Sequence, residues 1–329
     1  MKNHPSARRV VHALIAATSI AITASSSLVA QSISMDFVTV GNTGNAADSN
    51  GYGAVNYSYG IGKFEVTNAQ YTTFLNAVAQ SDPNGLYHFY HDGNPTVEGI
   101  SRSGSSGSYT YSVVGSTGNN PVAYVNWFDA ARFANWMHNG MGSGSTESGV
   151  YDLSLTGIAR MTASNGAKFR LATPDEWYKA AYYDPNKDGT GGYWMYPTQS
   201  NAIPTDAPGA GTNNANFAIT PDNTNPRVTP VGAHTGSPGA YGTYDMGGNL
   251  YEWINQTTDG GDAFAKGGGW AFGHTEMQKT NFGTIGNYTL AGGENDHNGF
   301  RLVSTSVPEP SSALIILLAS VCSLFLRSR

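Results

Sequence analysis

Cysteine is almost absent from this chain of 329 residues: the only one is Cys322, close to the C-terminus. Residues 31–310 therefore contain no thiol. This excludes a disulfide, a cysteine nucleophile and a cysteine metal ligand from that segment. Packing and bound ions are the remaining sources of stability.

Basic charge is also scarce. The chain has 17 Lys and Arg against 23 Asp and Glu, a net charge of −6. Segment 31–310 keeps 12 basic and 23 acidic residues, a net −11, because five basic residues lie at the ends: Lys2, Arg8, Arg9, Arg327 and Arg329. This balance argues against nucleic acid as a partner. It fits a soluble acidic extracellular protein, or one that attracts cations.

The N-terminus is typical of an export signal. Three basic residues precede an apolar run from Val10 to about Ala24, and small residues then lead to Ala30. We predict a signal peptide over residues 1–30, with a retained membrane helix as the alternative.

The C-terminus combines V-P-E-P at 307–310, an apolar run of 14 residues (Ala313–Leu326) and a basic end. The run is short for a stable span, and the arginines would stay on the cytoplasmic side. Together these features resemble the PEP-CTERM sorting signal, which implies transient anchoring in the inner membrane and cleavage by an exosortase. The predicted organisation is a signal peptide (1–30), one domain (31–305) and a sorting tail (306–329).

Three helices are predicted from their start signals. Thr67 and Gln70 form a capping box with a Val66–Tyr71 hydrophobic staple. Asn126 caps the second helix, with Asp129 in its first turn. The third helix begins with Thr173, Pro174 and Glu176, and Ala172 and Trp177 repeat the staple. We expect Trp127, Trp136 and Trp177 to lie in the core.

No long helical pattern occurs from 190 to 300, so we expect short strands and coil there. His88 and His91, in H-F-Y-H, have no acidic residue at helical spacing. We expect them at the surface rather than on a metal.

Residues Gly242–Trp253 read G-T-Y-D-M-G-G-N-L-Y-E-W, and Asp245 and Glu252 flank a glycine turn. Such a turn is either a rigid core corner or a cation site. Lys266–Phe272 (K-G-G-G-W-A-F) and Asn298–Leu302 (N-G-F-R-L) are predicted to pack with it.

A second turn, D-P-N-K-D-G, places Asp184, Asn186 and Asp188 at the first, third and fifth positions of a calcium loop. The twelfth position is Met195 instead of a bidentate Glu, so the loop is not an EF-hand. A plain surface turn is the alternative.

Six pieces in order resemble the formylglycine-generating enzyme, or sulfatase-modifying factor, family, from about Phe37 to Val303. They are K-F-E-V-T-N-A-Q-Y-T-T-F, P-V-A-Y-V-N-W-F-D-A-A-R-F-A-N-W, F-R-L-A-T-P-D-E-W-Y-K-A-A, Y-D-M-G-G-N-L-Y-E-W, K-G-G-G-W and N-G-F-R-L. The resemblance implies an α+β, C-type lectin-like fold with few capped helices, short strands and much irregular coil.

The family's activity does not carry over to this sequence. The enzymes use two cysteines after the G-G-S/G-W-like strand, and these places fall near Phe272 and Met277 here. Neither side chain binds copper as a thiolate, so no copper is expected. The helical domain that supplies metal histidines in the iron-dependent relatives is missing. The remaining histidines show no ligand spacing: His138, His234, His274 and His297.

Two calcium sites follow from the resemblance. One uses Asp245 and Glu252 with backbone oxygens of Gly248 and Leu250. The other aligns more loosely, with Asn216, Phe217, Asn223 and Asn225.

We therefore expect an exported, calcium-stabilised binding or structural module of the cell surface or extracellular matrix. Its expected partners are the exosortase and export machinery, and an extracellular polysaccharide or a surface protein. An enzyme with cysteine-independent chemistry in the same cleft is the alternative.

Overall fold

The computed structural model describes residues 1, 32–218, 227–258, 262–281, 288–290 and 292–306. The predicted signal peptide and sorting tail lie outside these residues, apart from Met1 and Ser306. Within the described ranges, no helix combines the length and the apolar content that a membrane span needs.

Four α-helices and five short 3-10 helices are present in the described part of the chain. The α-helices are α1 (Asn68–Val78), α2 (Tyr90–Gly93), α3 (Trp127–His138) and α4 (Pro174–Tyr182). The 3-10 helices are η1 (Thr117–Asn119), η2 (Gly157–Met161), η3 (Lys187–Gly189), η4 (His274–Met277) and η5 (Lys279–Asn281).

The three longer helices begin where the sequence predicts. Each starts at a capping box in which the cap side chain accepts from the third helical N–H and the third side chain accepts from the cap N–H. The boxes pair Thr67 with Gln70, Asn126 with Asp129, and Thr173 with Glu176. A box satisfies two backbone donors that a helix start otherwise leaves open.

The main core lies between α1, α3 and the strands that cross them. Tyr71 and Phe74 of α1 contact Phe133 of α3, with ring centroids 6.1 and 5.3 Å apart. Both halves of the predicted Val66–Tyr71 staple are fully buried. Trp127, Trp136 and Trp177 are also buried, as predicted.

The strands in the described residues are short and form two four-stranded sheets and two small ribbons. One sheet has the order β1-β2-β12-β5: Phe37–Val40, Tyr59–Gly62, Leu302–Ser304 and Phe169–Leu171. The other has the order β10-β9-β8-β11: Tyr288–Leu290, Asp262–Lys266, Tyr251–Thr257 and Asn298–Gly299. The ribbons are β3 with β4 and β6 with β7: Ile100–Ser103, Thr110–Val113, Tyr183–Asp184 and Gly192–Tyr193.

The second sheet joins the three motifs that the sequence analysis grouped together. Glu252 of β8 pairs with Lys266 of β9 in antiparallel register. The same Glu252 pairs with Gly299 of β11 in parallel register. The predicted association of Gly242–Trp253 with the two later glycine-rich pieces is therefore confirmed.

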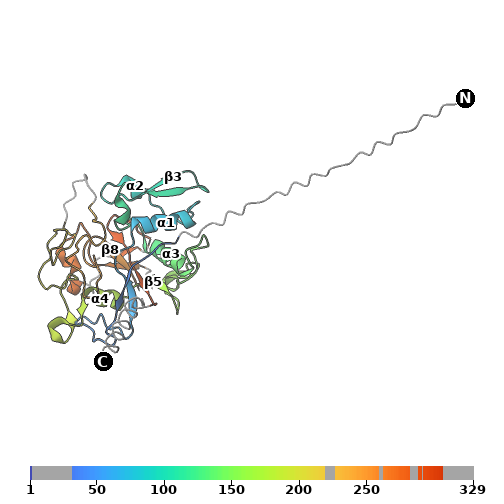
Figure 1. Cartoon of the computed structure of the whole chain (residues 1–329). Helices are drawn as coiled ribbons and strands as arrows, with labels where there is room; N and C mark the ends of the chain where they lie inside the picture. Colours follow the sequence, from blue (N-terminus) through green and yellow to red (C-terminus); the bar gives the residue numbers. More distant parts are fainter. Residues whose placement is uncertain (2–31, 219–226, 259–261, 282–287, 291, 307–329) are drawn as a thin grey trace.

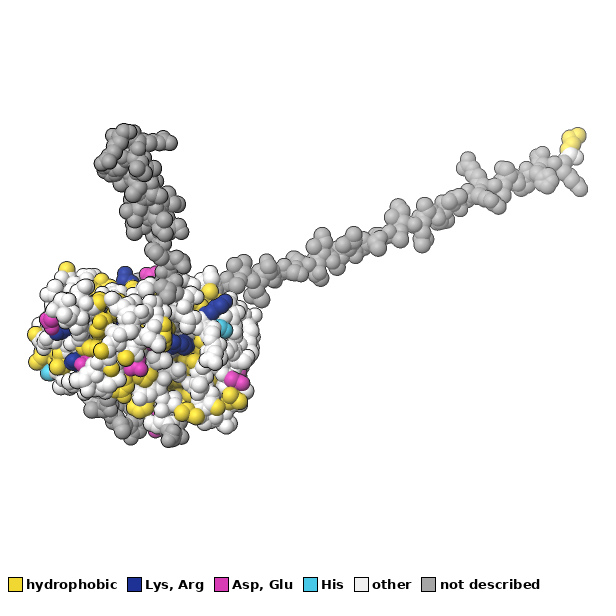
Figure 2. Space-filling view, turned by 90° about the horizontal axis from the view of Figure 1, so that it is seen from below, with side chains coloured by type: hydrophobic (Ala, Val, Ile, Leu, Met, Phe, Trp, Pro, Cys, Tyr) yellow, Lys and Arg dark blue, Asp and Glu magenta, His cyan; other side chains and the backbone are white. Residues whose placement is uncertain are grey.

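The described part has the predicted α+β character, and residues 190–300 hold only short strands, 3-10 turns and coil. In Figure 1, α2 and β3 lie at one end of the molecule and α4 near the other, with β8 between them. Charged side chains are scattered over the face shown in Figure 2, without a large block of one sign.

Candidate functional site

The turn within Gly242–Trp253 is tight because three of its residues have positive φ: Asp245 (56°), Gly248 (84°) and Asn249 (60°). A Cβ on Gly248 would lie 2.3 Å from the carbonyl oxygen of Asn216. Only glycine permits both this φ and this approach of the two backbones. The turn is therefore locked against the 214–217 segment, and the Asn249 N–H donates to the same carbonyl at 2.8 Å.

Glu252, at the end of the turn, forms a buried ion pair with Arg301. The Arg301 Nε donates to Glu252 Oε2 at 2.6 Å, and Nη2 donates to Oε1. Trp177 Nε1 also donates to Glu252 Oε2, at 2.8 Å. Burial opposes the charge on Arg301, but attraction to Glu252 outweighs it and raises the pKa of Arg301. A bidentate pair of this kind fixes β8 against the N-G-F-R-L segment.

Glu65 completes this buried group, and the sequence analysis did not single it out. Its carboxyl accepts from the Leu250 N–H at 3.2 Å and from Asn249 Nδ2 at 2.9 Å. Burial raises the pKa of Glu65 well above its ordinary value, and Asp245 and Glu252 act in the same direction. The only sequence signal was an acidic residue directly before the buried Val66.

The two predicted calcium ligand sets meet in one neighbourhood. Asn216 Nδ2 donates to Asn249 Oδ1 at 3.0 Å, which joins the Asn216–Phe217 segment to the turn. Phe217 and Leu250 are both buried. Asn223 and Asn225 lie outside the described residues.

The two carboxylates of the first predicted site have different neighbours. Both oxygens of Glu252 are engaged by Arg301, so this side chain does not fit the role of a calcium ligand. Asp245 Oδ2 accepts from the Gly232 N–H at 2.6 Å, and Oδ1 lies 3.8 Å from His234 Nδ1. Among the described residues, no three His, Cys, Asp or Glu side chains gather in a metal-binding group. Calcium binding at this turn stays a prediction.

The D-P-N-K-D-G turn, Asp184–Gly189, is held by local contacts. Asp184 Oδ1 accepts from the Asn186 N–H at 2.8 Å, and Oδ2 accepts from Trp194 Nε1 at 3.1 Å. Asp188 pairs with the neighbouring Lys187 at 2.7 Å and has φ of 54°. These contacts are those of a surface turn, and its calcium binding also stays a prediction.

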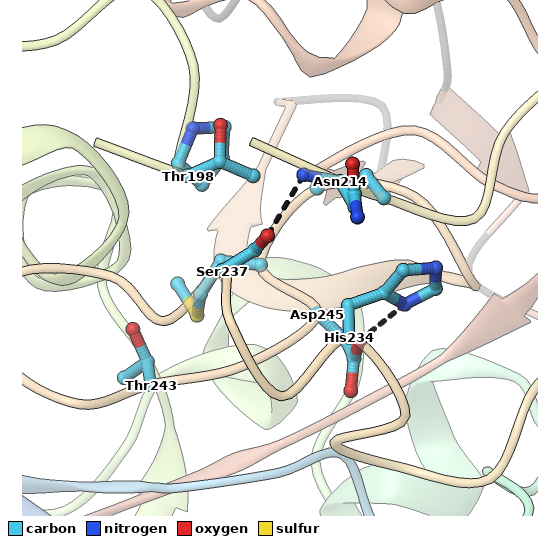
Figure 3. A pocket seen from close by; sticks show the side chains of 10 residues that line it. Thr198, Asn214, His234, Ser237, Thr243 and Asp245 are labelled. Carbon is cyan, nitrogen blue, oxygen red and sulfur yellow. Dashed lines mark hydrogen bonds and ion pairs between the residues drawn. The ribbon is translucent and has the colours of Figure 1, made fainter. Parts of the chain in front are cut away.

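A small polar hollow lies beside the turn (Figure 3). Its volume is about 10 Å³, which matches roughly one water molecule. His234 and Asp245 line it, with Ser237 and Asn214 close by. Ser237 Oγ accepts from the Asn214 N–H at 2.8 Å. Both His234 ring nitrogens are buried, and neither has a hydrogen-bond partner among the residues that the structure describes. The hollow is too small for an organic substrate.

A larger hollow of about 370 Å³ lies near the end of α1. It is lined by Val78 and Leu86 on one side and by residues 143–147 on the other. Its carboxylate, Glu147, is already paired with Arg132 Nε at 2.7 Å and with Asn84 Nδ2 at 2.9 Å. The hollow has the size of a small-ligand site, but its charge is locally balanced.

The sequence profile described as "Sulfatase-modifying factor enzyme 1-like domain" matches residues 38–306. The chain belongs to this family. Its fold is accordingly the C-type lectin-like fold of the sulfatase-modifying factor type.

Several solved structures are similar to this chain at low sequence identity. Treponema denticola variable protein 1 is 19% identical, with a TM-score of 0.50, over 84% of this chain and 97% of that one. CarF is 20% identical (TM-score 0.47, 83% and 98% covered). PvdO from Pseudomonas aeruginosa is 16% identical (TM-score 0.42, 83% and 91%). A comparison with curated proteins gives no match.

In this member of the sulfatase-modifying factor family, the two places that the resemblance assigns to cysteine are filled by packed side chains. Phe272 contacts Tyr251 and His297, with ring centroids 5.0 Å apart in both pairs. Met277 is buried beside Tyr196 and Phe217. Phe272 therefore packs against Tyr251 of β8, and Met277 packs in a separate cluster with Tyr196 and Phe217.

Polar side chains surround these two residues. Tyr196 Oη lies 2.9 Å from His274 Nδ1 and accepts from Gln278 Nε2 at 2.7 Å. Glu276 Oε2 accepts from Tyr251 Oη at 3.2 Å and from Asn281 Nδ2 at 2.7 Å. His274 and Glu276 come from η4, which places both on the same short turn. This group could hold or transfer a proton.

The structure corrects one histidine expectation. His91 is not at the surface but buried against Tyr71 and Tyr87, with Nε2 2.8 Å from the Ala123 carbonyl oxygen. Burial lowers its pKa to about 4. The pattern missed this because the residues that cover His91 come from other parts of the chain. His88 remains partly exposed, as predicted.

Proposed function

We propose that this chain is a family member that does not generate formylglycine, and that it serves as a binding or structural module. The supporting observation is the pair of side chains at the expected cysteine places. Phe272 and Met277 carry no thiol, and residues 31–310 contain no cysteine. Thiol–copper chemistry therefore has no residue to act through.

The test is direct. The purified protein is incubated with copper and a peptide that contains a sulfatase cysteine motif, and the peptide is then weighed by mass spectrometry. We expect no conversion of the cysteine above a control without protein. The matched control is the double variant Phe272→Cys, Met277→Cys, which places a thiol at both positions. Conversion by the wild-type chain would refute the proposal.

The proposal includes calcium as a structural ion. It is supported by the net acidity of segment 31–310 and by oxygen-bearing residues around the Gly248 turn. Asp245, Asn216 and backbone oxygens of residues 248 and 250 are the groups that would hold it. Calcium would offset the charge of Asp245 and tie the turn to the 216 segment.

The proposal also includes export and surface attachment. It is supported by the signal-peptide pattern and by the V-P-E-P, apolar and basic pattern at the C-terminus. The export machinery and an exosortase are the proposed processing partners. An extracellular polysaccharide or a surface protein is the proposed ligand.

A second candidate function is catalysis without cysteine. The observation that favours it is the hydrogen-bonded chain His274–Tyr196–Gln278 beside Met277, one of the two places where the family's reactive thiols would lie. Its test compares wild type with His274→Gln in a screen of peptide and saccharide turnover. Turnover by wild type that the variant loses would favour the enzyme, provided that both melt at the same temperature.

A further inference from the structure

Four aromatic side chains gather at the α2 end of the molecule, and we call them the aromatic platform: His88, Phe89, Tyr90 and Tyr124. The His88 and Tyr124 rings stack with centroids 4.8 Å apart and an angle of 8°. Phe89 and Tyr90 lie 4.0 Å apart, and Tyr90 lies 5.3 Å from Tyr124. Phe89 is 62% exposed and Tyr90 is 42% exposed. Grouped exposure of large apolar rings is typical of interaction surfaces.

Tyr124 of the platform is fixed by its surroundings. Tyr124 adopts a φ of 52°, which non-glycine residues rarely do. Its N–H donates to the Asn295 carbonyl oxygen at 2.9 Å, and its hydroxyl accepts from Asn94 Nδ2 at 2.8 Å. Rings fixed in this way lose little entropy when a ligand binds to them.

Two carboxylates lie at the platform's edge. Glu294 Oε2 is 3.6 Å from His88 Nε2, and Glu294 Oε1 accepts from Asn126 Nδ2 at 2.9 Å. Asp296 Oδ1 lies 2.9 Å from His297 Nδ1. Both side chains are partly exposed, by 19% and 31%. Among the described residues, no Lys or Arg forms an ion pair with either carboxylate.

Glu294 and Asp296 are the acidic groups at this edge of the platform. Burial lowers the pKa of His88, so its ring is neutral at neutral pH. Burial raises the pKa of Glu294, and Asn126 Nδ2 donates to its carboxyl group. A cation placed beside Glu294 would favour its ionised form.

We propose that the aromatic platform, with Glu294 and Asp296, binds the guanidinium or ammonium groups of a basic peptide segment on a partner protein. This inference rests on the proposed binding role. A guanidinium group is planar, so it can stack on Phe89 or Tyr90 while its N–H groups reach a carboxylate. An anionic polymer would be repelled by the same two carboxylates.

In the experiment, the purified full-length chain is titrated with a capped hexapeptide that contains two arginines. Binding is measured by titration calorimetry. The matched peptide has citrulline at both places, which keeps the shape but removes the charge. We expect the Kd of the citrulline peptide to be at least about tenfold higher than that of the arginine peptide. Phe89→Ala should weaken the arginine peptide by about two- to fivefold. Glu294→Gln with Asp296→Asn should weaken it by about tenfold.

Ile203→Ala, which truncates another exposed apolar side chain, is the control variant and should bind like wild type. Equal binding of both peptides, or no binding at millimolar arginine peptide, overturns the proposal. The proposal is also overturned if the protein binds a neutral sugar, maltohexaose, and this binding is weakened by Phe89→Ala but not by Glu294→Gln with Asp296→Asn. The cysteine-conversion assay is independent. If the arginine peptide does not bind and the cysteine peptide is not converted, this inference fails, while the proposal of a member that does not generate formylglycine stands.

Discussion

At the residue scale, the strongest constraint is the buried pair of Glu252 and Arg301. Removing one partner of a buried pair leaves an uncompensated charge, which costs roughly 3–5 kcal/mol of unfolding free energy. Glu252→Gln should therefore destabilise the fold by about that amount in urea denaturation. Glu147→Gln is the matched control, because Glu147 is 38% exposed and pairs with Arg132. The control should change stability by about 0–1 kcal/mol. Equal losses for the two variants would contradict this interpretation.

Asp245 is the residue through which the calcium proposal is tested. A ligand that binds only the native state at a hundredfold excess over Kd adds roughly 2.7 kcal/mol of stability. Wild type should melt higher in millimolar calcium than with chelator, and Asp245→Asn should lose most of that difference. Glu252→Gln should keep a calcium effect, because Glu252 is committed to Arg301. No shift in wild type and no metal by elemental analysis would leave the turn as a packed corner.

His91 makes stability depend on pH. Its pKa is about 4 in the folded state and about 6.5 when unfolded. Between these values the unfolded state binds more protons, so stability falls as the pH falls through this window. His91 should account for a loss of roughly 2 kcal/mol between pH 7 and pH 5. We expect His91→Gln to show a smaller loss over the same interval in urea denaturation. An unchanged pH dependence in the variant would show that the His91 ring takes up a proton in the folded state as readily as in the unfolded state.

At the element scale, the Gly248 turn joins two segments that are far apart in sequence. Gly248→Ala should destabilise the protein strongly, because its Cβ would overlap the Asn216 carbonyl oxygen and φ is positive. Gly44→Ala is a useful control: φ is 78°, but nothing lies within 4 Å of the added Cβ. That control should cost only about 1–2 kcal/mol. Thermal melts of both variants check this, and similar losses would mean that the close approach is unimportant.

Helix starts were predictable from sequence, while strands and buried charges were not. The capping boxes at Thr67, Asn126 and Thr173 depend on contacts three residues apart, which the sequence displays directly. Strands of two to four residues, such as β11 and β12, are too short to show periodicity. The burial of Glu65 and His91 depends on residues from distant parts of the chain.

The candidate site was predicted in part. The grouping of the turn with the two later glycine-rich motifs is confirmed. Glu252 was assigned to a calcium site from the family resemblance, and its pair with Arg301 depends on a residue 49 positions away in the sequence. The aromatic platform was also missed, since Tyr124 and Glu294 lie far from H-F-Y-H along the chain.

At the scale of the whole molecule, the proposed tail processing is open to direct measurement. Mass spectrometry of the mature native protein should find no peptide from Leu314–Leu326, because cleavage near the V-P-E-P removes it. The Pro308→Ala, Glu309→Ala variant is the control and should retain the tail. Secreted material that keeps an intact Arg329 end would contradict the processing proposal.

The position of β12 has a consequence for the order of events during synthesis. Residues 302–304 form the strand between β2 and β5, whose own residues are made more than 130 positions earlier. Until those last residues leave the ribosome, β2 and β5 have no strand to join them, and Arg301 is not yet available to Glu252. The first sheet is thus complete only after residue 304 has been translated.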